Sequence, residues 1–179
     1  ITITADAGQS KVYGASDPTF TYTNSPALES GDVFSGALSR ISGSSVGTYA
    51  YTIGSLSAGS NYTLSLAAGT FAITAKAITI TADAGQSKVY GTADPTFTYT
   101  NSPALESGDA FSGALSRISG SSVGTYAYTI GSLSAGSNYT LSLAAGTFAI
   151  TAKAITITAD AGQSKVYGAS DPTFTYTNS

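Results

Sequence analysis

The chain of 179 residues contains no histidine, cysteine, methionine or tryptophan, and only 9% of its residues are charged. Without histidine or cysteine it can build neither a Ser-His-Asp triad, nor a Cys-His pair, nor a metal site made of imidazole and thiolate ligands. The lack of cysteine also excludes disulfides, which suits a chain that is exported unfolded. This composition argues against an enzyme, and we expect no catalytic, cofactor-binding or metal-binding residues.

Positive charge is scarce and scattered. The net charge is −3 and the sequence pI is about 4.5. Nucleic acids and anionic membrane surfaces both require clustered basic side chains, and no transmembrane or lipidation motif is present. We therefore expect neither nucleic-acid binding nor membrane insertion. The basic residues are Lys11, Arg40, Lys76, Lys88, Arg117, Lys153 and Lys165.

A repeat with a period of 77 residues organises the sequence. The segment that begins at Ile1 returns at Ile78 and again at Ile155. A period of this length indicates an array of whole domains, and contacts between such small neighbouring domains should contribute to their stability. The two complete copies differ only at Ala15/Thr92, Ser16/Ala93 and Val33/Ala110.

The predicted domains are residues 1–77, residues 78–154 and an incomplete third repeat at residues 155–179. A frame that starts at Pro26 is an alternative that leaves the first 25 residues over. Because the chain starts and stops inside a repeat, we expect it to be a piece of a longer array. A fragment with about three strands can hardly fold alone. We therefore expect residues 155–179 to pack on the neighbouring repeat or to pair with another molecule.

Short segments of alternating polarity, separated by turn signals, fill each copy. They show the two-residue period of strands, and no helical period occurs. We expect residues 67–69 to join two of these strands as a hairpin. The predicted fold class is all-β, with tandem small antiparallel β-sandwich domains in an elongated rod. In the first copy the strand segments are residues 1–5, 11–14, 19–23, 37–41, 47–53, 62–66 and 71–75.

The junction between copies is the stiffest stretch of the sequence. Residues 70–84 contain no glycine and no proline, unlike the flexible linkers that commonly join domains. Phe71 and Ile73 are apolar at odd positions, whereas Ile78 and Ile80 are apolar at even positions. A shift of one residue turns the inward side chains of a strand to its other face. The junction is therefore predicted to be one extended segment with successive cores on opposite sides of it, unless a bulge at the junction absorbs the extra residue.

Carboxylates are the remaining candidates for chemistry. Asp6, Asp17, Glu29 and Asp32 could supply a carboxylate pair, but all four lie in predicted turns and loops. Calcium near Asp6 or Asp32 would need six or more oxygen ligands, and no dense run of acids provides them. The preferred interpretation is that these residues shape turns.

Lysine and asparagine residues suggest a second chemistry. Lys11, Lys76, Asn24 and Asn61 are the ingredients of intramolecular isopeptide bonds. Such a bond requires the lysine, the asparagine and an acid to be buried together. The preferred interpretation is that these are ordinary exposed side chains.

Two further surface motifs have simple structural explanations. Asn61 and Asn138 each begin an N-x-Thr sequence, which permits glycosylation in a suitable host, although asparagine also commonly turns the chain before a strand. Threonines alternate in residues 1–4 and 19–23, as in ice-binding surfaces. The preferred interpretation of these short rows is outward-facing threonine on an ordinary twisted strand.

Several short motifs in order resemble one family. They are Lys11-Val12-Tyr13-Gly14 followed by Asp17-Pro18, then Val46-Gly47-Thr48-Tyr49, then Asn61-Tyr62, and finally Gly69-Thr70-Phe71-Ala72-Ile73-Thr74. Together they resemble the MBG-type repeats (YGX type) of bacterial surface adhesins, over the whole copy and again in the second. The resemblance implies extracellular β-domains strung in tandem on adhesin-like proteins, and it implies no catalytic residues.

The sequence thus predicts a non-catalytic stalk or spacer of a bacterial cell-surface adhesin, with neighbouring repeats of the same chain as the main partners. The alternative is a module that binds host or matrix glycans or mucin through tyrosines and loop hydroxyls, with the array adding avidity. The two hypotheses differ in where the aromatic rings point. A spacer buries most of them, whereas a glycan binder exposes several on one face.

Overall fold

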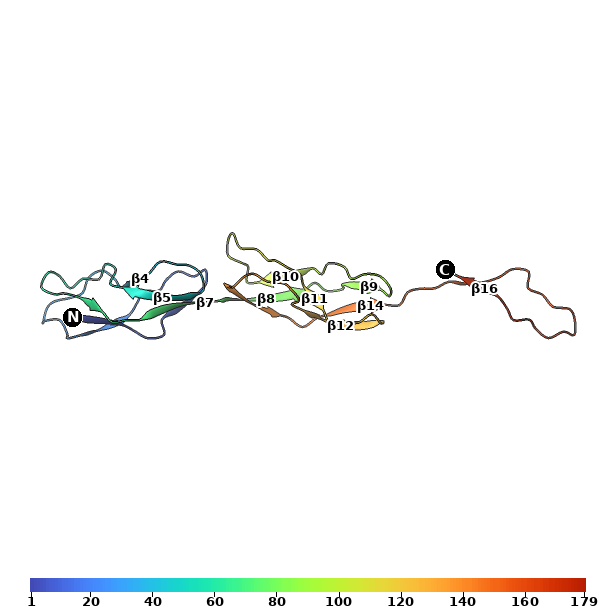
Figure 1. The fold of residues 1–179 in the computed structure, drawn as a ribbon, viewed down its shortest axis with the longest axis horizontal. Coiled ribbons are helices and arrows are strands. Elements are labelled where there is room, and N and C mark those ends of the chain that lie inside the picture. Colours follow the sequence, from blue (N-terminus) through green and yellow to red (C-terminus); the bar gives the residue numbers. More distant parts are fainter.

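The computed structural model describes residues 1–179 as an elongated all-β molecule. The two complete repeats lie one after the other along the long axis, followed by a separate hairpin at the carboxyl end (Figure 1). The fold class predicted from the sequence is therefore confirmed. No helix of the chain is long and apolar enough to cross a membrane.

Each repeat consists of two sheets. In the first repeat the three-stranded sheet has the order β3-β1-β6, and the four-stranded sheet has the order β2-β7-β5-β4. Most pairs are antiparallel, but β1 with β6 and β2 with β7 are parallel. The strands are β1 (Thr2–Ala5), β2 (Ser10–Val12), β3 (Tyr22–Ser25), β4 (Ser39–Arg40), β5 (Gly47–Thr52), β6 (Ser65–Leu66) and β7 (Thr70–Thr74).

The second repeat has the same topology, with sheets in the order β10-β8-β13 and β11-β12-β14-β9. Its parallel pairs are β8 with β13 and β9 with β14. The strands are β8 (Lys76–Ala82), β9 (Ser87–Val89), β10 (Tyr99–Ser102), β11 (Ser116–Arg117), β12 (Gly124–Thr129), β13 (Tyr139–Leu143) and β14 (Thr147–Thr151).

The hairpin expected at residues 67–69 is wrong. β6 pairs with β1 in one sheet, whereas β7 pairs with β5 and β2 in the other sheet. The connection itself is hydrogen-bonded to both sheets, because Ala67 donates to the carbonyl of Ile3 and Gly69 accepts from Tyr51. This short segment therefore carries the chain across the core from one sheet to the other.

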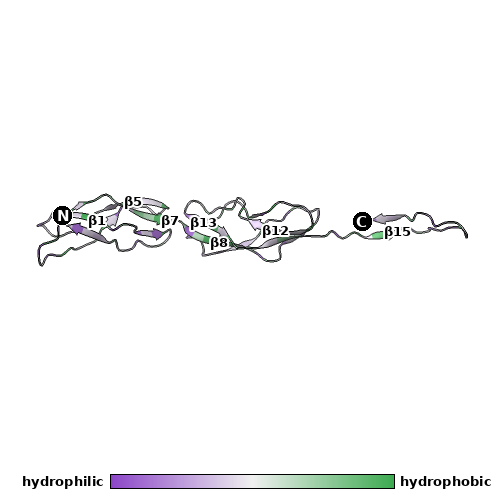
Figure 2. Ribbon diagram, turned by 90° about the horizontal axis from the view of Figure 1, so that it is seen from below, coloured by the Kyte–Doolittle hydropathy of each residue, from purple (hydrophilic) through white to green (hydrophobic).

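Each repeat has its own aromatic core. In the first repeat Phe20 contacts both Tyr51 and Phe71 edge to face, with ring centroids 5.3 and 5.1 Å apart. Such pairs add stability beyond the area they bury. The second repeat reproduces this cluster with Phe97, Tyr128 and Phe148, and Figure 2 shows the hydrophobic residues of β7 and β8 continuing into the two repeats.

The junction is extended, as predicted. Only Ala75 separates β7 from β8. Phe71 and Ile73 are buried in the first core, whereas Ile78 and Ile80 are buried in the second core. The change in apolar phase thus marks the point at which the chain passes from one core to the next.

The carboxyl-terminal hairpin of β15 (Ile157–Ala159) and β16 (Tyr176–Asn178) stands apart from the second repeat (Figure 1). It does not pack on the second repeat, which was one of the two arrangements expected for it, and pairing with another molecule stays a prediction. Residues 155–179 are identical to residues 1–25, in which Ile3 is covered by Leu38, Leu56 and other residues from further along the repeat. Without that cover Ile157 is 58% exposed, compared with 0% for Ile3.

Candidate functional site: the junction between repeats

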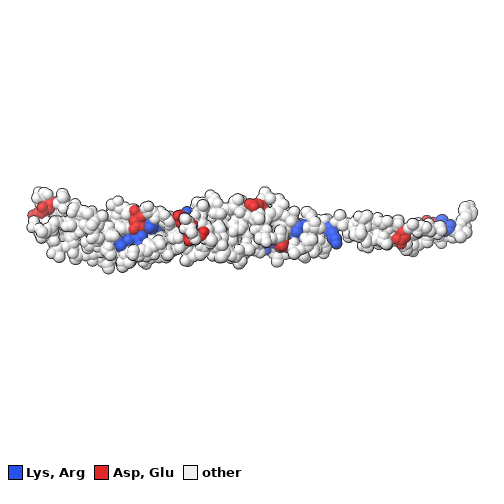
Figure 3. All heavy atoms as spheres, turned by 90° about the horizontal axis from the view of Figure 1, so that it is seen from above, with Lys and Arg blue, Asp and Glu red and all other residues white.

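The surface of the chain carries no pocket and no group of three or more acidic side chains that could hold a metal ion. Charged side chains are few and lie mostly in small groups of opposite sign on a largely uncharged surface (Figure 3). Hydrogen bonds, an ion pair and an aromatic contact come together where the first repeat meets the second. This junction is therefore the candidate functional site.

Two facing surfaces form the junction. We call the residues at the carboxyl end of the first repeat its distal face, and those of the second repeat that meet them its proximal face. The distal face comprises Tyr13, Gly14 and Val46, together with Lys76 at the point where the linking segment enters β8, and the proximal face comprises Glu106, Asp109, Asn138 and Tyr139.

Tyr13 is the centre of the contact. Its ring meets the ring of Tyr139 edge to face at a centroid distance of 5.4 Å, and it packs against the hydrophobic clusters of both repeats. Its hydroxyl donates to Asp109 Oδ2 at 2.9 Å. Tyr13 directly follows β2, whose pairing with β7 fixes its position, and its own amide donates to the carbonyl of Thr74. One side chain thus joins two cores.

Asp109 receives a second tyrosine hydroxyl. Tyr139 donates to the same Oδ2 atom at 2.5 Å and accepts a hydrogen bond from the amide of Glu106. Burial, reinforced by the bond to Asp109, raises the pKa of Tyr139 to about 12. The hydrogen bond to Asp109 likewise raises the pKa of Tyr13. Both hydroxyls therefore remain protonated donors at neutral pH.

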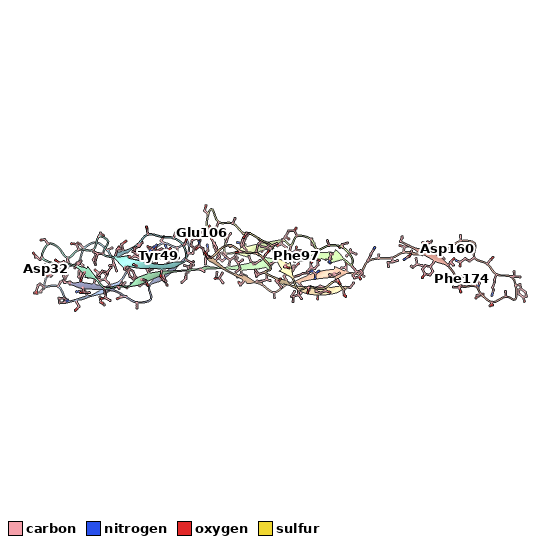
Figure 4. The ribbon with its side chains drawn as sticks, in the orientation of Figure 1. Asp32, Tyr49, Phe97, Glu106, Asp160 and Phe174 are labelled. Atoms are coloured by element: carbon pink, nitrogen blue, oxygen red, sulfur yellow. The ribbon has the colours of Figure 1, made fainter.

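Lys76 and Glu106 form an ion pair across the junction, with 2.5 Å between Nζ and Oε1. Gly14 makes room for this pair, because a Cβ atom on Gly14 would lie 2.3 Å from Cδ of Glu106. Gly14 also has a φ of +84°, which favours glycine. In the Tyr13-Gly14 pair, the tyrosine ring packs across the junction and the glycine leaves room for the Glu106 carboxylate. Glu106 lies at the boundary between the repeats in Figure 4, whereas Asp32 lies at the opposite end of the first repeat.

Backbone pairing also spans the junction. Lys76 and Ala77 pair in parallel with Tyr139 and Thr140, and the amide of Lys76 donates to the carbonyl of Asn138. Asn138 Oδ1 accepts a hydrogen bond from the amide of Val46 at 2.9 Å. The linking segment is therefore a strand of the second repeat, and rotation about it would break its pairing.

The predicted carboxylates have separate structural partners. Asp17 binds Lys11 and Arg40, and the Arg40 guanidinium holds the pKa of Asp17 down at about 2. Asp32 accepts the Tyr62 hydroxyl at 2.6 Å, and the Glu29 amide donates to that same hydroxyl. Asp6 contributes its backbone carbonyl to the Gln9 side chain. These contacts stabilise turns and loops.

The isopeptide ingredients are not brought together. Lys11 pairs with Asp17 and Lys76 with Glu106, while the Asn24 amide donates to the carbonyl of Pro26. Asn61 is exposed. No lysine therefore lies hydrogen-bonded to an asparagine in the buried arrangement that the reaction requires.

The two N-x-Thr sequences have different surroundings. Asn61 is exposed, whereas its equivalent Asn138 is half-buried and bonded to Val46. Glycosylation stays a prediction at Asn61, and at Asn138 a glycan would displace the junction contact. The alternating threonines form only short rows. Thr2 and Thr4 are exposed on a four-residue strand, and the Thr2 hydroxyl is hydrogen-bonded to that of Ser65.

Sequence reasoning missed the residues of the junction. Tyr13-Gly14 resembled the end of an ordinary strand, and Glu106 and Asp109 resembled loop acids. A signal was available in the recurrence of the Tyr-Gly pair at Tyr90 and Tyr167, but a recurring pair does not show which repeat it contacts.

Comparison with protein families gives one clear match. The profile of the MBG domain (YGX type) matches residues 1–72 and residues 78–149. No curated protein and no solved structure matches the chain. Because the family profile matches most of the chain, in two copies, the chain belongs to the MBG domain family (YGX type), whose members are repeat modules of bacterial surface proteins.

Proposed function

We propose that this chain is a stalk region of an extracellular bacterial adhesin, in which stiffly joined repeats hold a binding element away from the cell surface. The proposed building units are residues 1–77 and 78–154, with residues 155–179 as an incomplete third unit. The observation that carries this proposal is the junction, where Tyr13 packs against both cores and Lys76 lies in a strand of the second repeat.

The junction supports stiffness because several contacts would have to break together for the repeats to bend. A tyrosine hydrogen bond, an aromatic pair and the hydrogen bond from Val46 to Asn138 connect the two repeats. The linking strand is in turn held in the second repeat by its pairing with β13 and by the ion pair between Lys76 and Glu106. Each is modest on its own, and a partly exposed ion pair contributes only about 0–1 kcal/mol. Their combination around one short linking strand restrains rotation as well as bending.

The topology of each repeat supports a role under tension. The chain enters the first repeat through β1 and leaves through β7, at opposite ends of the elongated unit (Figure 1). Both strands have a parallel neighbour, β6 for β1 and β2 for β7. A pull along the rod therefore loads the hydrogen bonds of these pairs in shear, so that they must break together instead of one at a time.

Aromatic exposure favours the stalk over the glycan-binding alternative. Across residues 1–154, the tyrosine and phenylalanine side chains are buried or half-buried with the single exception of Tyr90. Tyr90 is the equivalent of Tyr13 on the face that has no neighbour. The complete repeats therefore offer no row of exposed rings on which sugars could stack.

Small-angle X-ray scattering on arrays of two, three and four complete repeats tests the stalk proposal. We expect the maximum dimension to increase by the same amount for each added repeat, with the cross-section constant. A maximum dimension that grows more slowly with each repeat, as in a freely jointed chain, would refute a rigid stalk. A glycan array probed with the same proteins should show no binding, and specific hits would favour the alternative.

A further inference from the structure

Two tyrosines from different repeats meet at the junction. The rings of Tyr13 and Tyr139 lie edge to face with their centroids 5.4 Å apart. Both hydroxyls donate to the same oxygen atom, Asp109 Oδ2, at 2.9 Å from Tyr13 and 2.5 Å from Tyr139. Two phenol groups that are far apart in the sequence are thus held side by side on one carboxylate.

This contact is the one place where two tyrosine rings pack against each other. Each of the other aromatic pairs includes at least one phenylalanine, which has no hydroxyl and is much harder to oxidise. The chain also lacks tryptophan, and it lacks cysteine and methionine, whose sulfur atoms oxidants commonly attack. Tyrosine is therefore the most readily oxidised side chain of this protein, and one pair of tyrosines is placed to react together.

We propose that Tyr13 and Tyr139 form an oxidative cross-linking site, at which a carbon–carbon bond between the two rings joins consecutive repeats covalently. The co-reactant is a one-electron oxidant, such as a peroxidase acting with hydrogen peroxide. This modification goes beyond the stalk role, and it does not depend on that role.

The reaction removes two electrons and two protons from the pair. Each phenol loses one electron and its hydroxyl proton and becomes a phenoxyl radical. The two radicals couple at ring carbons next to the hydroxyls, and the hydrogen on each of these carbons then moves as a proton to the phenol oxygen, which restores both aromatic rings. One molecule of hydrogen peroxide takes up the two electrons and two protons and becomes two molecules of water. The product is lighter than the starting protein by two hydrogen atoms.

Asp109 is placed to accept the hydroxyl proton when either ring is oxidised. A phenol becomes strongly acidic once it has lost an electron, and a positioned carboxylate can take up its proton in the same step. The hydrogen bond to Asp109 raises the pKa of Tyr13, so the reaction begins from the neutral phenol. Asp109 is itself exposed and can pass the proton on to water.

The oxidant has access to the pair from one side. Tyr13 is half-buried, so an oxidant at the surface can take an electron from its ring, whereas Tyr139 is only 8% exposed. An electron from Tyr139 can leave through the Tyr13 ring that contacts it. The rings must approach more closely than 5.4 Å to bond, and a rotation of the Tyr13 side chain, which lies outside any strand, brings them together.

A bond at this site would stabilise the junction. It would link two positions that are far apart in the sequence, and such a link restricts the unfolded chain in the way that a disulfide does. The chain contains no cysteine and cannot form a disulfide here. We therefore expect the cross-linked protein to melt at a higher temperature than the unmodified protein.

Oxidation of the full chain by a peroxidase and hydrogen peroxide tests the proposal. Tyr90, Tyr167 and Tyr176 are exposed and can form bonds between molecules, so the test uses dilute protein in which these three are replaced by phenylalanine. Groups that are held together react at effective concentrations far above that of dissolved protein. We expect a monomeric product that is lighter by two hydrogen atoms and shows dityrosine fluorescence, and peptide mapping by mass spectrometry should find Tyr13 linked to Tyr139.

Substitutions in this background have matched controls in the first repeat. Tyr13→Phe keeps the ring but removes the reacting hydroxyl, and it should abolish the linked product. Tyr62→Phe should leave the yield unchanged, because Tyr62 donates to Asp32 as Tyr139 donates to Asp109 but has no second tyrosine beside it. Asp109→Asn should slow the coupling several-fold, whereas Asp32→Asn should not. Circular dichroism of each variant shows whether a lost product reflects chemistry or unfolding.

Three results would overturn the proposal. The first is a chain that forms no link between Tyr13 and Tyr139 under conditions that couple free tyrosine. The second is dityrosine fluorescence that Tyr13→Phe does not reduce, which would assign the coupling to other tyrosines. The third is equal coupling rates in Asp109→Asn and Asp32→Asn, which would remove the carboxylate from the reaction. None of these outcomes alters the scattering test of the stalk, which uses unoxidised protein.

Discussion

Replacing Gly14 with alanine should loosen the junction, and the same change at Gly91 is its matched control. The two glycines have φ values of +84° and +88°. A left-handed conformation costs an L-residue about 1–2 kcal/mol, so both substitutions carry the same backbone penalty. Only at Gly14 does the added methyl group meet another residue, since its Cβ would lie 2.3 Å from both Cδ and Oε1 of Glu106.

The difference in stability between the two variants therefore measures the contribution of the Glu106 contact at the junction. To reach ordinary van der Waals contact, the Glu106 carboxylate must retreat by about 1 Å, which breaks its 2.5 Å contact with Lys76. Because both partners are partly exposed, the pair contributes about 0–1 kcal/mol. We expect Gly14→Ala to destabilise the protein by about 0.5–1 kcal/mol more than Gly91→Ala, equivalent to about 1–4 °C in melting temperature.

Urea unfolding followed by circular dichroism compares the two variants under identical conditions. Because Ala15 follows Gly14 and Thr92 follows Gly91, the comparison should also be made in a Thr92→Ala background. The extra loss at Gly14 should shrink in high salt, which screens exposed ion pairs. Equal destabilisation by the two substitutions at low salt would refute the idea that Glu106 holds the repeats together.

Three further outcomes are expected. In calorimetry, Tyr13→Ala should lower the melting temperature and separate the unfolding transitions of the two repeats. Tyr90→Ala in dilute solution should leave the unfolding profile unchanged, and equal effects of the two substitutions would contradict the junction described above. Arg40 lowers the pKa of Asp17 to about 2, so the stabilisation from this carboxylate is present above its unfolded pKa of about 4 and is lost as the pH falls toward 2. Asp17→Asn should therefore be less stable than the wild type at pH 7. A difference in stability between the two proteins that persists at pH 2 would refute this assignment. The buried hydroxyls of Tyr51 and Tyr128 have no hydrogen-bond partner. Replacement of either tyrosine by phenylalanine should therefore raise the free energy of unfolding in urea by about 1 kcal/mol. A lower free energy of unfolding would indicate that the hydroxyl has a partner.

The sequence was sufficient to predict the local features of this fold. The two-residue period around Phe71, Ile73, Ile78 and Ile80 specified extended structure and the change of core, because it depends only on neighbours along the chain. The long period likewise specified tandem units. The partner of each strand was harder to predict. β6 and β7 are adjacent in sequence but lie in different sheets, since their partners are chosen by packing across the core.

The junction could not be predicted for the same reason. Tyr13 and Asp109 lie 96 positions apart, and their contact depends on how two folded repeats meet. The aromatic residue of a Tyr-Gly pair at the end of a strand is equally consistent with a core residue of its own repeat. The role of Tyr13 at the junction is evident only from the comparison of the two repeats in the structure, because Tyr13 is half-buried whereas its equivalent Tyr90 is exposed.

The rigidity of the junction is tested most directly by a distance measurement between equivalent positions of the two repeats. Ile41 and Ile118 are both more than half exposed, and the chain has no cysteine, so Ile41→Cys with Ile118→Cys accepts two spin labels at defined sites. Pulsed electron paramagnetic resonance on this variant should give one narrow distance distribution, which broadens when Tyr13→Ala is added. A distribution that is already broad with Tyr13 in place would contradict a stiff connection between the repeats.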